Sequence, residues 1–175
     1  MRNTIRLAYD HLTKDKVMSF LIDKFRDEID WGNRYNSNYA LSIANLIIEQ
    51  QISFKAAITV KKRFAKIVDK KSQSEIMNMS NTDLQSIGIS FRKAEYIKNV
   101  FHFFKNKTID FDKMSDKEVI DCLVTIKGVG EWTAQMFLIF NLFRQDIFSP
   151  KDLALINSIK KNYLLELSLI HISEP

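Results

Sequence analysis

The sequence predicts an all-α protein, and three observations support this prediction. Apolar residues recur in several segments with the period of an amphipathic helix. The 175 residues include four glycines and two prolines, too few for the tight turns of an all-β sandwich. Hydrophobic residues make up 46% of the chain, enough for one compact core, which argues against global disorder.

The first elements are a surface helix and a central helix. Apolar residues at helical spacing predict an amphipathic helix over residues 17–29. Its expected inner stripe is Val17, Phe20, Leu21, Phe25 and Ile29. A polar stretch, residues 31–38, ends it. Residues 39–50 are apolar on nearly all sides, which a helix sustains only when it runs through the centre of a domain.

Serines mark the starts of the next predicted helices. Ser53 is placed to cap a helix with an apolar inner stripe. The lysines of this helix are expected to form a solvated face: Lys55, Lys61, Lys62 and Lys66. A short helix over residues 81–87 is closed by Gly88, and Ser90 opens another helix.

The last predicted helices flank a glycine-rich turn. Ser115 and Glu118 form a capping-box pattern that opens a helix, which is expected to end at Gly128. Residues 128–130 then form a three-residue connection to an apolar helix over residues 132–143. After a further break, Asp152 falls at or near the start of the last helix.

Composition limits the function classes. A formal charge of +5 and a pI near 9.2 favour a polyanionic partner, although ordinary surfaces also carry excess lysine. Cys122 is the only cysteine, which excludes an internal disulfide and a site built on several thiolates. The three histidines are scattered, so we expect no catalytic metal. Nothing resembles a signal peptide or a membrane span.

The turn at Gly128, Val129 and Gly130 is a candidate anion site. Glycines on both sides of a valine allow a sharp turn and leave amide N–H groups uncovered where the next helix begins. Such a turn can hold a phosphate. The alternative is that the glycines merely join two helices.

Three ordered segments resemble one protein family. Ile126, residues 128–130 and the pair Thr133-Ala134 resemble the hairpin of the helix-hairpin-helix DNA glycosylase superfamily. Residues 45–57 resemble the Gln-Gln-x-Ser element of its 3-methyladenine glycosylase II branch, and residues 88–97 resemble its Gly-x-Ser-x-x-Lys-x-x-Tyr-Ile stretch. Together with an aspartate described below, the resemblance covers about residues 40 to 160.

The resemblance implies a fold and an activity. It implies a two-lobed helical fold in which residues 1–166 form one domain, with the hairpin at about residues 116–143. It also implies a monomeric base-excision repair enzyme that binds double-stranded DNA, flips an alkylated purine and hydrolyses its N-glycosidic bond. We expect a cytoplasmic location, which in a bacterium is the cytoplasm or nucleoid. The resemblance requires no cofactor but allows a monovalent cation at the hairpin carbonyls.

Asp152 matches the catalytic aspartate of this superfamily, which follows the hairpin by about twenty residues. A carboxylate near the anomeric carbon stabilises an oxocarbenium-like transition state and can orient or deprotonate the attacking water. The start of a helix favours the charged form of such a carboxylate. The alternative for Asp152 is a plain helix N-cap. The neighbouring Asp146 matches a position that supports the loop.

Trp132 stands where bifunctional members of the superfamily carry a nucleophilic lysine, which argues for a monofunctional enzyme that leaves an abasic site and does not nick the strand. An electron-rich ring there could stack on a flipped cationic base. Alternatively, Trp132 is simply part of the core.

Further site residues follow from the resemblance. Gly128, Val129, Gly130 and Thr133 are expected at the DNA backbone. Gln51 matches the residue that fills the gap left by the flipped nucleotide, although without the resemblance Gln50 and Gln51 are ordinary polar residues at a helix end. Tyr39 and Met136 are candidates for the base pocket, or else core residues.

The chain departs from the family pattern at three places. Glu131 stands where this branch often has proline, and Lys151 replaces a second acidic residue, so the preferred lesion and the roles of both residues stay open. Residues 167–175 (LSLIHISEP) look like a translated sequencing adapter, so we expect the natural chain to continue differently after about Glu166.

Two other classes of function remain. A non-catalytic helix-hairpin-helix DNA-binding module would keep Gly128, Val129 and Gly130 but would need no exposed carboxylate. A structural helical adaptor would bury Gln51 and would carry no basic surface around the hairpin. The exposure of Asp152 and of Gln51 therefore distinguishes these classes.

Overall fold

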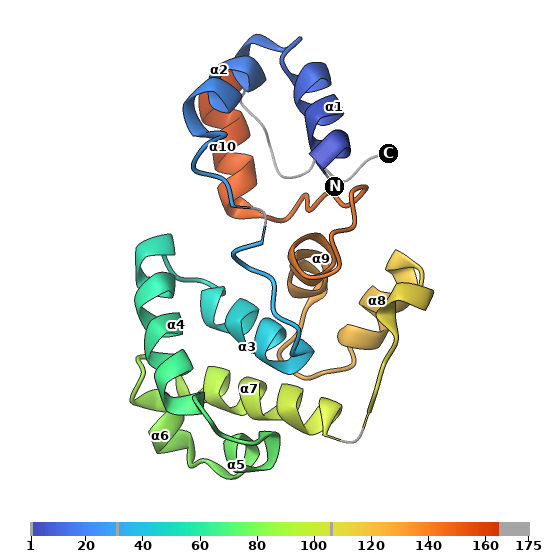
Figure 1. Ribbon diagram of the computed structural model, residues 1–175. Helices are drawn as coiled ribbons and strands as arrows, with labels where there is room; N and C mark the ends of the chain where they lie inside the picture. The colour runs from blue at the N-terminus through green and yellow to red at the C-terminus, as the bar shows by residue number, and fades with distance from the viewer. Residues whose placement is uncertain (1, 31, 106, 165–175) are drawn as a thin grey trace. The chain divides into compact units, whose positions relative to one another are not determined.

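The computed structural model describes residues 2–30, 32–105 and 107–164 (Figure 1). Within these ranges all regular structure is helical, with ten α-helices and one 3₁₀ turn and no strand. The all-α prediction is therefore confirmed. Residues 167–175, the segment with the expected non-native sequence, lie outside the described residues.

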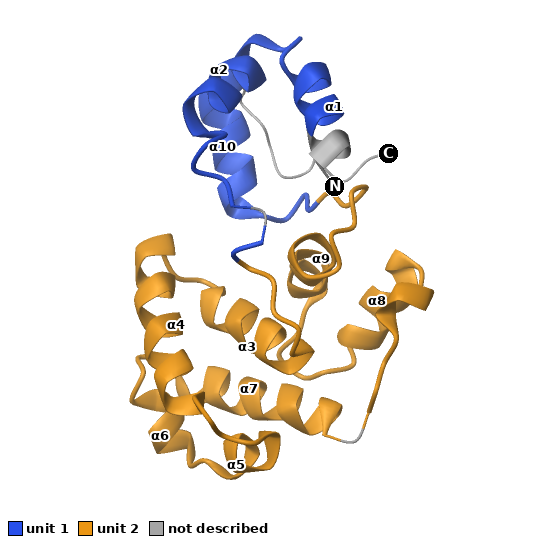
Figure 2. Ribbon diagram, in the orientation of Figure 1, with its two compact units in different colours: residues 1–33, 149–175 blue, residues 34–148 orange. Residues whose placement is uncertain are grey.

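The chain divides into two compact units (Figure 2). The first unit combines residues Met1–Asn33 with residues Ser149–Pro175, and the second unit is the continuous segment Arg34–Phe148. This division agrees with the predicted two-lobed organisation.

The first unit contains helices from both ends of the chain. They are α1 (Arg2–Leu12), α2 (Lys16–Phe25) and α10 (Leu153–Tyr163). The Asp15 carboxylate caps α2 at the backbone N–H of Met18 and also accepts a hydrogen bond of 2.9 Å from the Tyr163 hydroxyl. This side-chain contact connects segments that are 148 residues apart.

Helix α2 differs from the predicted helix over residues 17–29. It ends at Phe25, because the charged residues 26–28 that follow give a longer helix no apolar surface to bury. Within α2 the buried residue is Ile22, whereas Phe20 is 58% exposed. The expected inner stripe was therefore wrong.

The second unit is built around α3 (Tyr39–Glu49), which confirms the predicted central helix. Seven of its residues are buried, and it packs against α4 (Phe54–Val68), α7 (Phe91–Phe104) and α9 (Glu131–Phe140). The shorter helices lie at the periphery of this unit: α5 (Gln73–Asn78) and α6 (Asn81–Gln85) against α7, and α8 (Asp116–Leu123) against α9 (Figure 1).

The predicted serine caps are confirmed. The Ser53 hydroxyl accepts from the backbone N–H of Ala56, and the Ser90 hydroxyl accepts from that of Lys93. Ser115 forms the expected capping box with Glu118. A further capping box opens α5, a helix of six residues that is too short for its periodicity to be recognised in the sequence.

The connection before α9 is longer than expected. Helix α8 ends at Leu123 and not at Gly128, so residues 124–130 join it to α9. The chain leaves the helix to bury Ile126 and Val129, which are 4% and 5% exposed, and the backbone N–H of Val129 donates to the carbonyl of Ile126 across 2.9 Å. We call residues 124–130 the hairpin loop.

Across residues 2–30, 32–105 and 107–164, no helix combines the length and the apolar character that crossing a membrane requires.

Candidate functional site

Gly128 and Gly130 have different surroundings in the hairpin loop. Gly128 has a φ of +106°, a conformation that favours glycine. A Cβ atom there would lie 2.1 Å from Cγ of Tyr96, so the ring of Tyr96 also requires a glycine. Gly130 is the N-cap of α9, and a Cβ atom at Gly130 would meet no atom within 4 Å. Of the two, Gly130 thus leaves open space beside the start of a helix.

Gln50 connects the end of α3 to the hairpin loop. Its side-chain Nε2 donates to the carbonyl of Gly128 across 3.1 Å and to the Thr133 hydroxyl across 3.0 Å. Thr133 itself is 1% exposed. The Thr133 hydroxyl is therefore engaged inside the protein, and a contact of this residue with DNA, which stays a prediction, would have to use its main chain.

Lys93 lies at the C-terminal end of α3, where carbonyl groups lack helical partners. Its Nζ donates to the carbonyls of Ile48 and Gln50, at 2.9 and 2.5 Å. Burial lowers the pKa of this ammonium group, and the two carbonyls replace part of the hydration that it loses. A cation at this end of a helix also interacts favourably with the helix dipole.

Gln51 follows directly in the turn between α3 and α4. It is exposed and has a φ of +55°, which is uncommon for a residue with a side chain. Unusual backbone conformations of this kind persist only where the surrounding structure holds them. Its exposure does not fit the adaptor class, in which Gln51 is buried.

Of the predicted pocket residues, Met136 is 6% exposed and belongs to the core cluster. Tyr39 is half-buried and packs edge-on against the rings of Phe111 and Phe137, with centroid distances of 5.3 and 5.4 Å. Burial, with a smaller effect of Asp112, raises the pKa of Tyr39. Trp132 is partly buried against the core. For Tyr39 and Met136 these contacts agree with the core alternative, and their pocket role stays a prediction.

Asp152 belongs to the first unit, whereas the hairpin loop and Gln51 belong to the second unit. It is the N-cap of α10, and its Oδ1 accepts from the backbone N–H of Leu155 across 2.9 Å. The position at a helix start is therefore confirmed. Asp152 as a residue is partly exposed, and its carboxylate serves as the cap of the alternative interpretation.

A charged cluster lies beside Gln50. Glu49, whose side chain is 14% exposed, pairs with Arg34 and, at 2.5 Å, with Lys61. The Arg34 guanidinium also stacks 3.8 Å from the ring centroid of Phe140. Lys61 was expected on a solvated face, and this was wrong, because the largely buried Glu49 carboxylate binds it.

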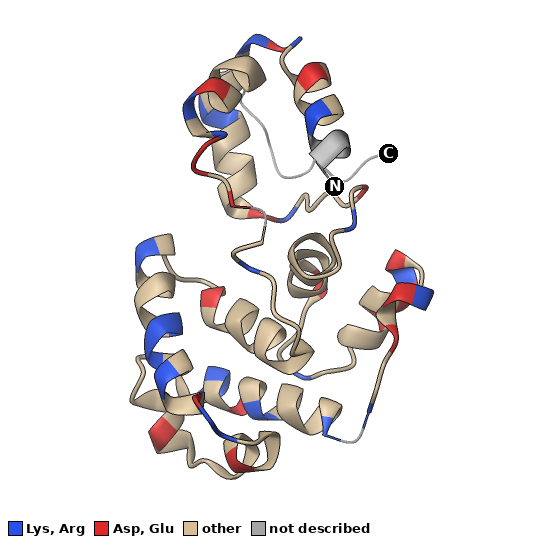
Figure 3. Cartoon of the chain, viewed as in Figure 1, with Lys and Arg blue, Asp and Glu red and all other residues tan. Residues whose placement is uncertain are grey.

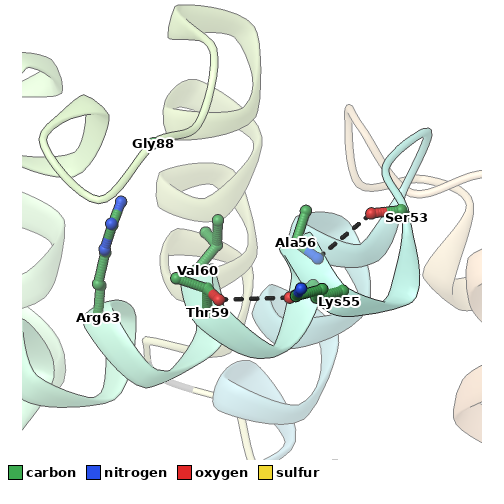
Figure 4. A pocket seen from close by; sticks show the side chains of 7 residues that line it. All are labelled: Ser53, Lys55, Ala56, Thr59, Val60, Arg63 and Gly88. Carbon is green, nitrogen blue, oxygen red and sulfur yellow. Dashed lines mark hydrogen bonds between the residues drawn. The ribbon is translucent and has the colours of Figure 1, made fainter.

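Basic residues recur along the length of α4 (Figure 3). An open hollow of about 420 Å³ lies between α4 and the loop after α6 (Figure 4). Its lining includes Lys55, Thr59 and Arg63, and the Arg63 guanidinium donates to the carbonyl of Ile87 across 3.3 Å. The hollow has the charge of an anion-facing surface but no enclosed shape.

In the part of the chain that the structure describes, no group of three His, Cys, Asp or Glu side chains could hold a metal ion. A monovalent cation at the hairpin stays a prediction. The carbonyls of Lys127 and Gly128 each accept a hydrogen bond, from Asn99 and Gln50.

The sequence motifs contained residues whose roles only the structure reveals. Lys93 and Tyr96 were recognised as parts of a motif, but Gln50 and Asn99 were not assigned to the site. For Asn99 the sequence contained a signal. Lys93, Tyr96 and Asn99 follow one another at intervals of three residues, which places them on one face of a helix.

Comparisons with known proteins agree with this architecture. A family model described as HhH-GPD superfamily base excision DNA repair protein matches residues 44–168. The chain is 34% identical over 137 residues to a DNA-3-methyladenine glycosylase of Saccharomyces cerevisiae, covering 71% of this chain and 46% of that protein. It is 31% identical over 164 residues to DNA-3-methyladenine glycosylase 1 of Schizosaccharomyces pombe, covering 85% of this chain and 72% of the relative. The chain spans about half the length of the first curated relatives that it matches.

Solved structures of DNA glycosylases are also similar to this chain. A DNA-3-methyladenine glycosidase from Bacillus halodurans is 34% identical, with a TM-score of 0.61 over 74% of this chain and 62% of the other. A 3-methyladenine DNA glycosylase from Schizosaccharomyces pombe, solved in complex with abasic DNA, shares the fold with a TM-score of 0.82 over 94% of this chain and 85% of the other, at 24% identity. With its helical fold, its glycine hairpin and this family match, the chain belongs to the HhH-GPD superfamily of base excision DNA repair proteins.

Proposed function

We propose that this protein is a monofunctional DNA glycosylase that removes alkylated purines of the 3-methyladenine type from double-stranded DNA and leaves an abasic site. The relatives named as 3-methyladenine glycosylases support the substrate class. The observation that carries the proposal is the hairpin loop, in which Gly130 leaves open space at the start of α9. The start of a helix favours phosphate, so DNA backbone can approach there.

In this proposal the loops hold DNA and Asp152 assists the chemistry. The loop at Gly130 contacts the backbone, and Gln51 fills the space left by the flipped nucleotide. Loss of an alkylated purine develops positive charge on the sugar, which the Asp152 carboxylate stabilises while it orients water. The base is already cationic and leaves readily, so one carboxylate suffices. Trp132 provides the stacking surface for this base.

The N-cap contact of Asp152 allows its two roles to be separated. Asparagine caps a helix as well as aspartate does, whereas alanine does not. Asp152→Asn therefore retains the bond to the Leu155 N–H but loses the charge. We expect Asp152→Ala to be less stable than Asp152→Asn by about 1 kcal/mol in the free energy of unfolding, because only alanine removes the cap. Both variants should release free base from methylated duplex DNA at least about 100-fold more slowly.

Different results would contradict different parts of the proposed function. Base release by Asp152→Asn at the parental rate would contradict the catalytic role of the Asp152 carboxylate. If the folded parent binds DNA but releases no base from alkylated or deaminated duplexes, the chain is a non-catalytic helix-hairpin-helix binding module. Size-exclusion chromatography of the parent with a lesion duplex tests the further proposal that one monomer binds one DNA site.

A further inference from the structure

One face of α7 reaches two loops that are far apart in the sequence. Lys93 donates to the carbonyl of Ile48 in α3 and to that of Gln50, the residue immediately before Gln51. One turn later, the Tyr96 ring lies against Gly128. Another turn later, Asn99 Nδ2 donates to the carbonyl of Lys127 across 3.2 Å. The same helix thus holds both the turn that carries Gln51 and the hairpin loop.

Gln50 also connects the turn that carries Gln51 to the hairpin loop. Its carbonyl accepts from Lys93, and its side chain donates to Gly128 and Thr133. The residue immediately before Gln51 is therefore fixed at both its main chain and its side chain. This fixation favours the positive φ of Gln51, which is uncommon for a residue with a Cβ atom.

We propose that Lys93 and Gln50 are positioning residues, which set Gln51 at a fixed place relative to the hairpin loop so that both engage DNA together. They touch neither the base nor the sugar in this inference, and act only through Gln51 and the loop. The inference rests on the proposed glycosylase function and deepens it. All of the atoms involved lie in the second unit.

Lys93→Met tests the inference, because it keeps an unbranched chain of similar length but removes the donors. The matched control is Lys98→Met on the same helix, since Lys98 donates to the carbonyl of Met79 and to Asn81, away from Gln51. Base release is measured on methylated duplex. Base unstacking is measured by the fluorescence of 2-aminopurine placed beside a tetrahydrofuran abasic-site analogue. We expect Lys93→Met to lower both signals about tenfold or more, and Lys98→Met to leave them near the parental level.

A double-mutant cycle with Gln51→Ala provides a readout that a merely structural role would not move. If Lys93 acts through Gln51, Lys93→Met has little further effect on unstacking once Gln51 is alanine. Effects that multiply in the double variant overturn the proposal. Should Lys93→Met fail to fold, Gln50→Glu replaces it, since a carboxylate of the same shape cannot donate to the Gly128 carbonyl.

The experiments give different results if the positioning role is wrong and if the proposed function is wrong. A folded parent that neither unstacks nor releases base contradicts the proposed function, and the positioning role with it. If instead the parent is active and Gln51→Ala is impaired, but Lys93→Met behaves like Lys98→Met, then only the positioning role is wrong.

Discussion

At the scale of single residues, two glycines that look equivalent in the sequence have different physical reasons to be glycine. The sequence placed both Gly128 and Gly130 in the site. It could not show that Tyr96 fills the space over one of them, because that contact joins residues far apart in the chain. For the same reason, the sequence could not distinguish the buried Thr133 hydroxyl from an exposed one.

The two glycines give a matched pair of alanine variants. Gly128→Ala forces a side chain into a positive φ and against Tyr96, so we expect a loss of at least about 2 kcal/mol in the free energy of unfolding. Gly130→Ala meets open space, so we expect a smaller loss, below about 1 kcal/mol, which arises because alanine is a poorer N-cap than glycine. Its methyl group should weaken binding to duplex DNA. Urea denaturation and fluorescence anisotropy measure the two effects. Unchanged DNA binding by a folded Gly130→Ala variant would contradict the close approach of DNA at this residue.

At the scale of elements, helix starts were predicted better than helix ends. Ser53, Ser90 and Ser115 begin helices as expected, because an N-cap bond is formed within four consecutive residues. Helix α8 stops before Gly128 because Ile126 and Val129 are buried by the rest of the second unit. The sequence pattern of one segment does not contain that information.

The capping box of α8 predicts a pH dependence of stability. Hydrogen bonds from the side chain and backbone of Ser115 lower the pKa of Glu118 below its usual 4.5. A carboxyl with a lowered pKa in the folded state stabilises the protein above its unfolded pKa, and this contribution is lost as the pH falls through the folded pKa. Glu118→Ala should therefore be less stable than the parent at neutral pH.

The difference between Glu118→Ala and the parent should shrink as the pH falls below 4.5. Thermal unfolding of both proteins across this range measures it. In a Ser115→Ala background, Glu118 has lost its side-chain partner, and the pH dependence should weaken. A difference that stays constant across the acidic range contradicts the capping role of the ionised carboxylate.

At the scale of the whole molecule, the sequence predicted the helical class and the resemblance predicted two lobes, but neither indicated which segments form each lobe. Helical periodicity describes each segment by itself. It cannot show that the first helices share a unit with α10, an association marked by the hydrogen bond between Tyr163 and Asp15. Such pairing depends on contacts between the two ends of the chain.

The net charge of +5 is also a property of the whole molecule, and it predicts how DNA binding responds to salt. Each phosphate that the protein neutralises releases a condensed counterion, so the logarithm of the binding constant should fall linearly with the logarithm of salt concentration. Four contacted phosphates would give a slope of about −3.6. Anisotropy titrations of an undamaged duplex at several salt concentrations measure the slope. A slope near zero would contradict a phosphate-contacting surface.

The division of the chain also determines the order in which its parts become available during synthesis. The second unit is one continuous stretch, complete once residue 148 has left the ribosome, whereas the first unit needs α10 as well as the first 33 residues. Because domains of a nascent chain fold as they emerge, the hairpin loop can form before Asp152 and α10 are in place. A nascent chain that stalls in this interval therefore has a complete second unit but an incomplete first unit.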